Sequence, residues 1–248
     1  MNVSLYQAAS SLHAMDRWQE LIAENLASGA VPGYKKQDFS IVAVQAGLHG
    51  APAAGGSRGV MMTTGSPVTN FGPGESRVTN IKTDVSIDGK GFFEVQLPTG
   101  AMGYTRNGEF HIDSQGQLVT NEGYKVQGEN GPLVLDLNNH NELSISASGE
   151  ISQGADSKGR LRLTEFANTG LLTRLSGSYF TADNPGVGAS ASTTSTVRQG
   201  MVEASNLSVV TEMAKLLTAM RMFESNQKMA QIHDDRLAKT INDLGSVN

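Results

Sequence analysis

The chain has no cysteine among its 248 residues. This absence excludes disulfide bonds, thiol catalysis and zinc sites ligated by cysteine. The sequence also lacks an uninterrupted apolar run of about 18 residues, the length that a transmembrane helix needs. Its N-terminus has no charged region followed by an apolar stretch, as a cleavable signal would. We therefore expect neither membrane insertion nor a cleaved signal peptide.

An excess of positive charge is absent too. The chain carries 19 basic and 24 acidic residues, for a net charge of −5, and the basic residues form no cluster. Because clustered lysine and arginine bind phosphate backbones and anionic membrane surfaces, this distribution argues against nucleic acid and such membranes as partners. The length leaves room for one large domain or two small ones.

The sequence offers little for chemistry. The stretch from Asp84 to Gly89 lacks the ligands that a calcium loop has at its third and twelfth positions, and the glycines around Lys90 and Pro73 do not fit a phosphate-binding loop. The histidines lack the spacing of metal ligands; they are His13, His49, His111, His140 and His233. We therefore expect no catalytic residue, metal, cofactor or small-molecule substrate, and a chain that is not an enzyme.

What the sequence does contain is a long amphipathic pattern at its C-terminal end, from Glu203 to Leu244. Charged residues flank the apolar seam, and neither glycine nor proline interrupts the pattern before Gly245. A helix with one narrow apolar stripe is marginal alone and needs a partner helix along most of its length. The heptad places position a at Met213, Met220, Gln227, Asp234 and Ile241, and position d at Leu216, Phe223, Ala230, Leu237 and Leu244.

The N-terminal end carries a matching pattern from Ser4 to Leu26, which ends at Gly29 before Pro32. The two helices either pair only with each other, as a stalk, or also serve other copies of the chain. Trp18 favours the second alternative, because it flanks the seam and would be exposed unless another surface covered it. The predicted assembly interface comprises Leu5, Leu12, Met15, Trp18, Ile22, Leu26, Met213, Leu216, Met220, Phe223, Leu237, Ile241 and Leu244.

The middle of the chain reads as all-β. Between residues 81 and 182, turn signals such as Asn107-Gly108, Gly116 and Gly123 recur every seven or eight residues and separate short β-rich stretches. The fold class is therefore α+β, with a mainly-β domain inserted between long terminal helices that form a coiled-coil assembly region. The expected segments are an N-terminal helix and turn (1–35), an extended linker rich in Gly, Ala, Ser and Thr (36–80), the β domain (81–182), a return linker (183–201) and the C-terminal helix (202–248).

Short motifs at both ends and in the middle carry a family resemblance. Gly91-Phe92-Phe93, Tyr104-Thr105-Arg106-Asn107-Gly108 and Gly116-Gln117-Leu118-Val119 are the motifs of the middle. The terminal motif residues are Asn25, Leu26, Ala27, Pro32, Gly33, Tyr34, Ser205, Asn206, Arg221, Phe223 and Glu224. In this order they resemble the bacterial flagellar rod and hook proteins, although Ser28 and Val31 depart from the usual pattern.

The resemblance implies a structural subunit of the flagellar basal-body rod, which polymerises helically through its terminal helices and transmits torque for motility. It also implies export into the periplasm by the flagellar type III export apparatus without a cleaved signal peptide, and contacts with other copies and with neighbouring rod and hook subunits. The short interval from residue 33 to residue 91 is most similar to a proximal rod protein.

Other readings stay open. One is a distal rod or hook-type paralogue of the same family. Another is a β-rich surface-binding or carbohydrate-binding module on a coiled-coil stalk, although the aromatic residues of the middle occupy positions that a β core would use. An enzyme is the third class, and no nucleophile, metal set or cofactor loop supports it.

Overall fold

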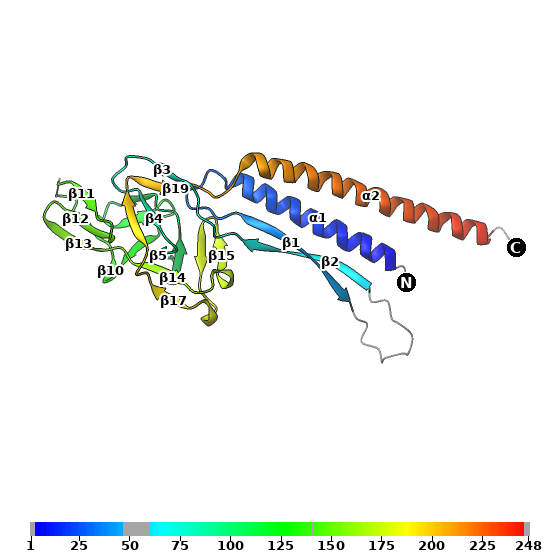
Figure 1. Cartoon of the computed structure of the whole chain (residues 1–248), viewed down its shortest axis with the longest axis horizontal. Helices are drawn as coiled ribbons and strands as arrows, with labels where there is room; N and C mark the ends of the chain where they lie inside the picture. The colour runs from blue at the N-terminus through cyan, green and yellow to red at the C-terminus, as the bar shows by residue number, and fades with distance from the viewer. Residues whose placement is uncertain (1–2, 47–59, 140, 246–248) are drawn as a thin grey trace. The chain divides into compact units, whose positions relative to one another are not determined.

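The computed structural model describes residues 3–46, 60–139 and 141–245, which form two compact units (Figure 1). Unit 1 comprises Met1–Ala27, Gln37–Thr69 and Ser208–Asn248. Unit 2 comprises Ser28–Lys36 and Asn70–Leu207. Helices at both ends and a β-rich middle agree with the α+β class predicted from the sequence.

Unit 1 contains the two long helices, α1 (Val3–Ala27) and α2 (Val209–Gly245), together with strands β1 (Gln37–Ala46) and β2 (Val60–Thr69). Figure 1 draws α1 and α2 side by side, with the β1–β2 hairpin along α1, and both helices contact each other over many residues. At the start of α2 the Ser208 carbonyl accepts the first helical hydrogen bond, from the backbone N–H of Glu212 at 3.0 Å.

Helix α1 has two buried sides. Trp18 and Asn25 contact the hairpin, whereas Gln19 contacts α2. Because side chains three, four and seven residues apart share a side of a helix, buried Ala14 and Leu21 lie on the hairpin side. Met15 and Ile22 are also buried, and each lies three or four residues from both Trp18 and Gln19, so they fall between the two contact sides. Gln19, a residue of the predicted N-terminal pattern, thus contacts α2, and the hairpin covers the side of Trp18 and Asn25.

The hairpin corrects the prediction of an extended linker over residues 36–80, apart from residues 47–59 of that linker, which lie outside the described residues. Strands β1 and β2 pair in continuous antiparallel register from Gln37↔Thr69 to Ala46↔Val60. Small residues and threonine are typical of a linker, but a hairpin can be stable with such residues when one face packs on a helix.

The C-terminal helix also begins later than predicted, because Met201–Glu203 forms strand β19 against β3 (Ser76–Val78).

Unit 2 is built from short antiparallel strands in several sheets (Figure 1). The largest sheet has the order β15-β16-β6-β5-β9-β8-β7, with β14 and β17 attached through β5 and β10 attached through β9; β11-β12-β13 form a second sheet, and β18 pairs with β4. The bounds of these strands are Val85–Asp88 (β4), Phe92–Gln96 (β5), Met102–Thr105 (β6), Phe110–Ile112 (β7), Leu118–Thr120 (β8), Lys125–Gly128 (β9), Gly131–Pro132 (β10), Leu143–Ile145 (β11), Glu150–Gln153 (β12), Asp156–Arg160 (β13), Leu163–Phe166 (β14), Thr173–Ser176 (β15), Tyr179–Thr181 (β16), Ala189–Ala191 (β17) and Thr196–Gln199 (β18).

Two apolar clusters form the core of unit 2. The larger one gathers buried residues of many strands, such as Val95, Phe93 and Ile151, and the smaller one is mainly aromatic and centres on Phe92 and Phe180.

The return linker predicted over residues 183–201 is largely structured, since β17 pairs with β14 and β18 pairs with β4. One-turn 3-10 helices at Thr169–Leu171 and Pro185–Val187 join the last strands.

Candidate functional site

The buried side of α2 differs from the predicted seam. The residues predicted at position d lie on it, but each described residue predicted at position a is replaced by the residue that precedes it in the chain. Ala219 is fully buried and its carbonyl accepts a hydrogen bond from Gln19 of α1 at 3.5 Å. Leu216, Phe223 and Ala230, predicted at position d, are half-buried on the same side. The residues predicted at position a are exposed instead, namely Met213, Met220, Gln227 and Asp234. The contact with α1 therefore follows residues 216, 219, 223, 226 and 230.

The physical reason lies in the size of Ala219. A small side chain lets a neighbouring helix approach closely, whereas Met220 at the same level would hold the two helices apart. Hydrophobicity alone favours the methionines, because the sequence contains two interleaved 3-4 series that share Leu216, Phe223 and Ala230. Packing against α1 selects the series with smaller residues.

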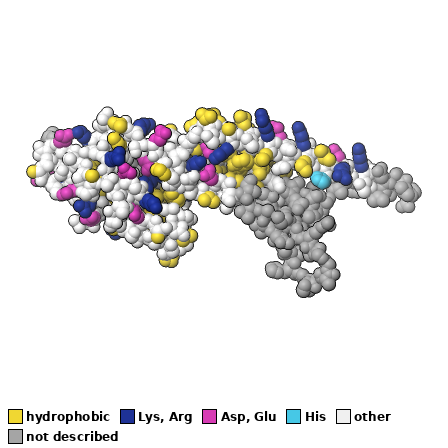
Figure 2. All heavy atoms as spheres, viewed as in Figure 1, with side chains coloured by type: hydrophobic (Ala, Val, Ile, Leu, Met, Phe, Trp, Pro, Cys, Tyr) yellow, Lys and Arg dark blue, Asp and Glu magenta, His cyan; other side chains and the backbone are white. Residues whose placement is uncertain are grey.

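An apolar stripe remains uncovered on the first turns of α2. Its side chains are 46% to 79% exposed and recur at helical spacing, so they share one side of the helix. Figure 2 shows hydrophobic side chains gathered at the surface over this part of α2. The α2 stripe consists of Val209, Val210, Met213, Leu217 and Met220.

Trp18 is covered by the chain's own hairpin. Its ring stacks on that of Phe39 in β1, with centroids 6.4 Å apart and planes at 13°. On β2, opposite Ile41, Gly65 leaves room for the Phe39 ring, since a Cβ at Gly65 would lie 2.0 Å from the ring's Cζ. The half-burial of Trp18 thus has an intramolecular cause.

The remaining predicted interface residues of the helices have mixed positions. Met15 and Ile22 are buried, and Leu12 and Leu26 are half-buried. The side chains of Leu5, Leu237, Ile241 and Leu244 lie outside the described residues.

Two polar contacts fasten the hairpin within unit 1. Asn25 is fully buried and forms a two-way hydrogen bond with the backbone of Gln37: its Nδ2 donates to the Gln37 carbonyl at 2.8 Å, and its Oδ1 accepts from the Gln37 N–H at 2.9 Å. Lys215 of α2 bridges the carboxylates of Glu212 at 2.7 Å and Asp38 at 3.3 Å. Burial opposes the charge of Lys215, but these carboxylates outweigh burial and raise its pKa.

In unit 2 the Pro32-Gly33-Tyr34 motif lies against the segment that leads to α2. Gly33 donates its N–H to the Glu203 carbonyl at 2.7 Å and adopts φ +67°. A Cβ at Gly33 would lie 2.2 Å from the backbone nitrogen of Asn107, so both the conformation and the contact require glycine. Tyr34 is fully buried, and the guanidinium of Arg174 stacks over its ring at 4.8 Å.

A buried ionic cluster joins three distant segments at this place. The Nζ of Lys35 donates to Oε1 of Glu203 at 2.5 Å, and the Arg106 Nη1 lies 3.4 Å from Oε2 of the same carboxylate. None of the three side chains is more than 6% exposed. Burial lowers the pKa of Lys35 and of Arg106, and in each case Glu203 partly offsets this effect. Removal of Glu203 would leave two buried cations without a counter-charge.

Asn206 completes this junction with three backbone segments. Its Oδ1 accepts from the N–H of Lys36 at 2.9 Å, and its Nδ2 donates to the carbonyls of Asn70 at 2.8 Å and Gly72 at 3.0 Å. The neighbouring Ser205 accepts the N–H of Leu207 through its hydroxyl at 3.3 Å. The chain leaves unit 2 after Lys36 and Leu207 and re-enters at Asn70, so Asn206 links the unit 2 ends of these crossings.

The structure thus gives the motif residues unequal roles. Asn25, Gly33, Tyr34 and Asn206 make the contacts described above. The other motif residues differ in burial. Leu26 and Pro32 are half-buried, Phe223 lies on the side of α2 that faces α1, and Ala27, Arg221 and Glu224 are exposed. Sequence reasoning missed Lys35, Arg106 and Glu203 as a site, although Lys35 adjoins and Arg106 belongs to a quoted motif, and Glu203 begins the predicted C-terminal pattern. Charged residues inside otherwise apolar or small motifs were the available signal.

The described residues contain no group of three or more His, Asp or Glu side chains placed to hold a metal ion. Among the described helices, none combines the length and the apolar character of a membrane span.

Comparison with known proteins connects these features to one family. Residues 86–153 match the family described as "Flagellar hook protein FlgE/F/G D1 domain", and residues 198–244 match "Flagellar basal body rod FlgEFG protein C-terminal". The flagellar basal-body rod protein FlgG of Borreliella burgdorferi is 30% identical over 260 residues, which cover 94% of this chain and 96% of that protein. This chain belongs to the flagellar basal-body rod protein family. The resemblance inferred from the motifs is confirmed.

Relatives of two kinds match this rod-family chain. FlgG of Buchnera aphidicola subsp. Baizongia pistaciae is 31% identical over 257 residues, covering 95% of this chain and 97% of that protein. The flagellar basal-body rod protein FlgF of Caulobacter vibrioides is 29% identical over 249 residues and is covered completely, as is this chain. Both junction segments of unit 2, at residues 33–36 and 203–206, therefore lie within the aligned length.

Proposed function

We propose that this chain is a non-enzymatic structural subunit of the flagellar basal-body rod, which polymerises helically through α1 and α2 and transmits torque. The α2 stripe carries this proposal. Five apolar side chains at helical spacing stay exposed although α2 already has a helix partner in α1. Exposed apolar surface of this extent on a helix is typical of a protein interface, and other copies of the chain are the occupants that rod membership supports.

The same proposal names the binding partners of the chain and its location in the cell. The partners are further copies, neighbouring rod and hook subunits, and the flagellar type III export apparatus, with export requiring no cleaved signal. The place is the periplasm-spanning rod of the basal body. The names of the relatives support the rod as the location.

The junction in unit 2 supports torque transmission. The chain passes between the two units four times, and Lys35, Glu203, Arg106 and Asn206 bind the unit 2 ends of three of these passages, at residues 36, 70 and 207, to one another. A subunit that passes force from one unit to the other needs several chain connections anchored at a rigid place, since a single linker would only tether them. The buried charges, each held by a partner, supply that rigidity.

We propose further that the chain is a proximal rod protein of the FlgF type. Identities of 29% to 31% do not separate FlgF from FlgG. Length supports the FlgF relatives: 94% of 248 residues is about 233, so the 260-position alignment with Borreliella FlgG leaves about 27 positions without a residue of this chain. The alignment with Caulobacter FlgF spans 249 positions and covers both chains completely.

The assembly proposal is tested by placing a carboxylate in the α2 stripe with Met220→Asp. Because Met220 is exposed in the single subunit, the variant should fold normally, but an unpaired carboxylate buried at every subunit contact costs several kcal/mol per copy. We expect no filaments on concentration of the purified protein, viewed by electron microscopy, and no swimming in cells. Thr218→Asp, which adds the same charge at an exposed position outside the stripe, is the control. Normal filaments and swimming with Met220→Asp would refute the proposal.

A further inference from the structure

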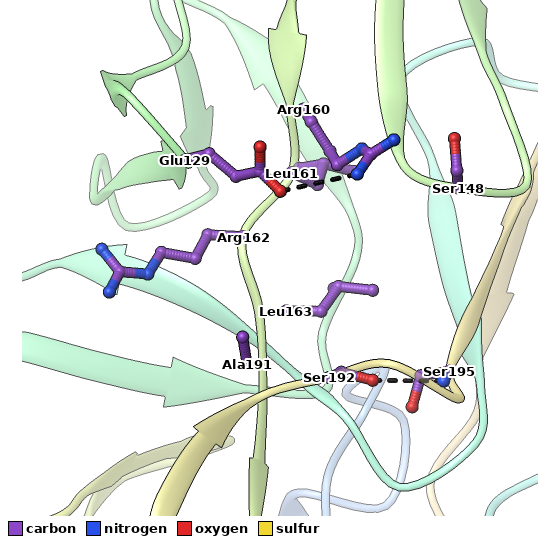
Figure 3. A pocket seen from close by; sticks show the side chains of 9 residues that line it. All are labelled: Glu129, Ser148, Arg160, Leu161, Arg162, Leu163, Ala191, Ser192 and Ser195. Carbon is purple, nitrogen blue, oxygen red and sulfur yellow. Dashed lines mark hydrogen bonds and ion pairs between the residues drawn. The ribbon is translucent and has the colours of Figure 1, made fainter.

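The charged groups at a cavity of about 320 Å³ in unit 2 have partners within the chain itself (Figure 3). Figure 3 shows Arg160 directed to Glu129, with their charged groups 3.7 Å apart. Arg162 also lines this cavity, and it pairs with Glu94 at 3.2 Å. Among the described residues that line it, the charges are therefore balanced, and they give an outside ligand no counter-charge to bind. Exposed side chains without such a balance lie on α2 instead.

Farther along α2 than the α2 stripe, a second set of apolar side chains is exposed. Met222 is 47% exposed, Met229 is 55% exposed and Ile232 is 57% exposed. Their spacing of seven and three residues places them on one side of the helix, together with exposed Ser225 between them. We call this set the distal stripe; it comprises Met222, Ser225, Met229 and Ile232.

The distal stripe and the α2 stripe lie on opposite flanks of the side that contacts α1. In the distal stripe, Met222 comes directly before Phe223, which faces α1. In the α2 stripe, Leu217 comes directly after Leu216, which also faces α1. Since successive residues of an α-helix are about 100° apart, the side that faces α1 lies between the two stripes. A neighbouring helix on one stripe therefore leaves the other stripe open to a further neighbour.

The two stripes match each other at a fixed offset along the helix. Positions 222, 225, 229 and 232 of the distal stripe lie 12 residues after positions 210, 213, 217 and 220 of the α2 stripe. Both series therefore alternate intervals of three and four residues, which is the spacing at which two parallel helices pack side by side. The next position of each series is charged and exposed, and these positions, Glu224 and Arg236, are also 12 residues apart.

These two charges select the direction of the contact. In a parallel pair offset by 12 residues, Glu224 of one copy faces Arg236 of the next, at the end of the apolar contact. In an antiparallel pair the intervals of the two stripes would still match, but Glu224 would face Thr218. Because opposite charges at facing positions of paired helices set their orientation, the parallel pair is favoured.

We propose that the distal stripe of one copy of the chain docks on the α2 stripe of the next, with the two α2 helices parallel and displaced by 12 residues, or about 18 Å at 1.5 Å per residue. The proposal rests on the proposed function and specifies the contact by which copies join. The two surfaces differ, so every copy keeps one of each for a further copy. Displacement along the helix axis prevents closure into a ring, and the contact therefore propagates as an open helical filament.

The absence of cysteine from the chain allows a direct test by disulfide cross-linking. Leu217→Cys and Met229→Cys are made in separate full-length chains, which are mixed in equal amounts, concentrated into filaments and oxidised. A disulfide needs Cα atoms closer than about 7 Å, so only positions that face each other cross-link efficiently. We expect the mixture to give a cross-linked dimer on a gel run without reductant, and either chain alone to give much less.

Other arrangements of the stripes predict other products. Cross-linking of Leu217→Cys with itself would place like stripes in contact. Preferential cross-linking of Met213→Cys with Met229→Cys would indicate antiparallel helices. Either result would overturn the proposal, as would filaments in which positions 217 and 229 do not cross-link. Absence of filaments from the parent chain would overturn the proposed function as well, so the two failures are distinguishable.

Charge reversal tests the facing pair. Arg236→Glu places two carboxylates opposite each other and should raise the concentration needed for filament growth by roughly two- to fivefold. Adding Glu224→Arg to this variant should restore growth, because opposite charges then face each other again. Lys239→Glu reverses an exposed charge on the same helix outside both stripes and should have little effect. Equal growth of Arg236→Glu and the double variant would overturn the pairing of Glu224 with Arg236.

Discussion

Glu203 accepts a hydrogen bond from Lys35 at 2.5 Å although 168 residues separate them in the chain, and neither side chain is more than 4% exposed. The pair joins the segment that follows α1 to the segment that precedes α2. It is therefore one of the contacts through which these two segments meet inside unit 2, and its removal has a defined consequence.

Glu203→Gln should strongly destabilise unit 2. Glutamine keeps the shape of the side chain but removes the charge, which leaves Lys35 and Arg106 buried without a counter-ion, at a cost of about 3–5 kcal/mol. Urea unfolding followed by tyrosine fluorescence measures the loss, since all tyrosines except Tyr6 belong to unit 2. Glu142→Gln is the control, because Glu142 pairs with Lys82 at the surface and should leave stability unchanged. An equally stable Glu203→Gln variant would show that the cluster is not needed for the fold.

Ala219→Leu should weaken the contact between α1 and α2. Ala219 is fully buried, and a larger side chain there forces the helices apart, at a cost of about 1–3 kcal/mol. Thermal unfolding followed by circular dichroism at helical wavelengths measures this. Ala214→Leu makes the same change at an exposed position of α2 and should be neutral. If the two variants melted alike, the helices would not be packed through Ala219.

Gly65→Ala should expose Trp18. The added Cβ would lie 2.0 Å from the Phe39 ring, so this ring must move away from its stacked position on Trp18. Since Trp18 is the only tryptophan, its emission reports this change without interference and should shift to longer wavelength. Ser66→Ala, at the next and exposed position of β2, should leave the emission unchanged. An unshifted spectrum in Gly65→Ala would contradict the stacked arrangement.

The loop that contains Ser192 and Ser195 should loosen in acid. Hydrogen bonds from the hydroxyls of Ser192 and Ser195 lower the pKa of Glu165 below its usual 4.5. A lowered pKa means that the carboxylate stabilises the fold at pH values above 4.5, and that this contribution is lost as the pH falls through the lowered pKa. Hydrogen exchange of residues 192–195 should therefore speed up in acid more than expected from the chemical exchange rate. In Glu165→Gln this additional acceleration should disappear, and its persistence would assign the effect to another group.

The sequence by itself determined the helices at both ends and the short strands between glycine turns. These features depend on local spacing, because residues three and four apart share a helix side and glycine permits turns that other residues resist. The flagellar motifs were equally local, since each is a short run of adjacent residues.

Only the tertiary structure decided which residues of α2 face α1, what covers Trp18, and that Lys35, Arg106 and Glu203 share one site. Two interleaved series of α2 satisfy the same spacing rule, and the choice between them depends on how closely another helix can approach Ala219. The hairpin that covers Trp18 and the ionic cluster both join segments distant in the chain. Such pairings leave no periodic trace in the sequence, because they depend on where the backbone brings each side chain in space.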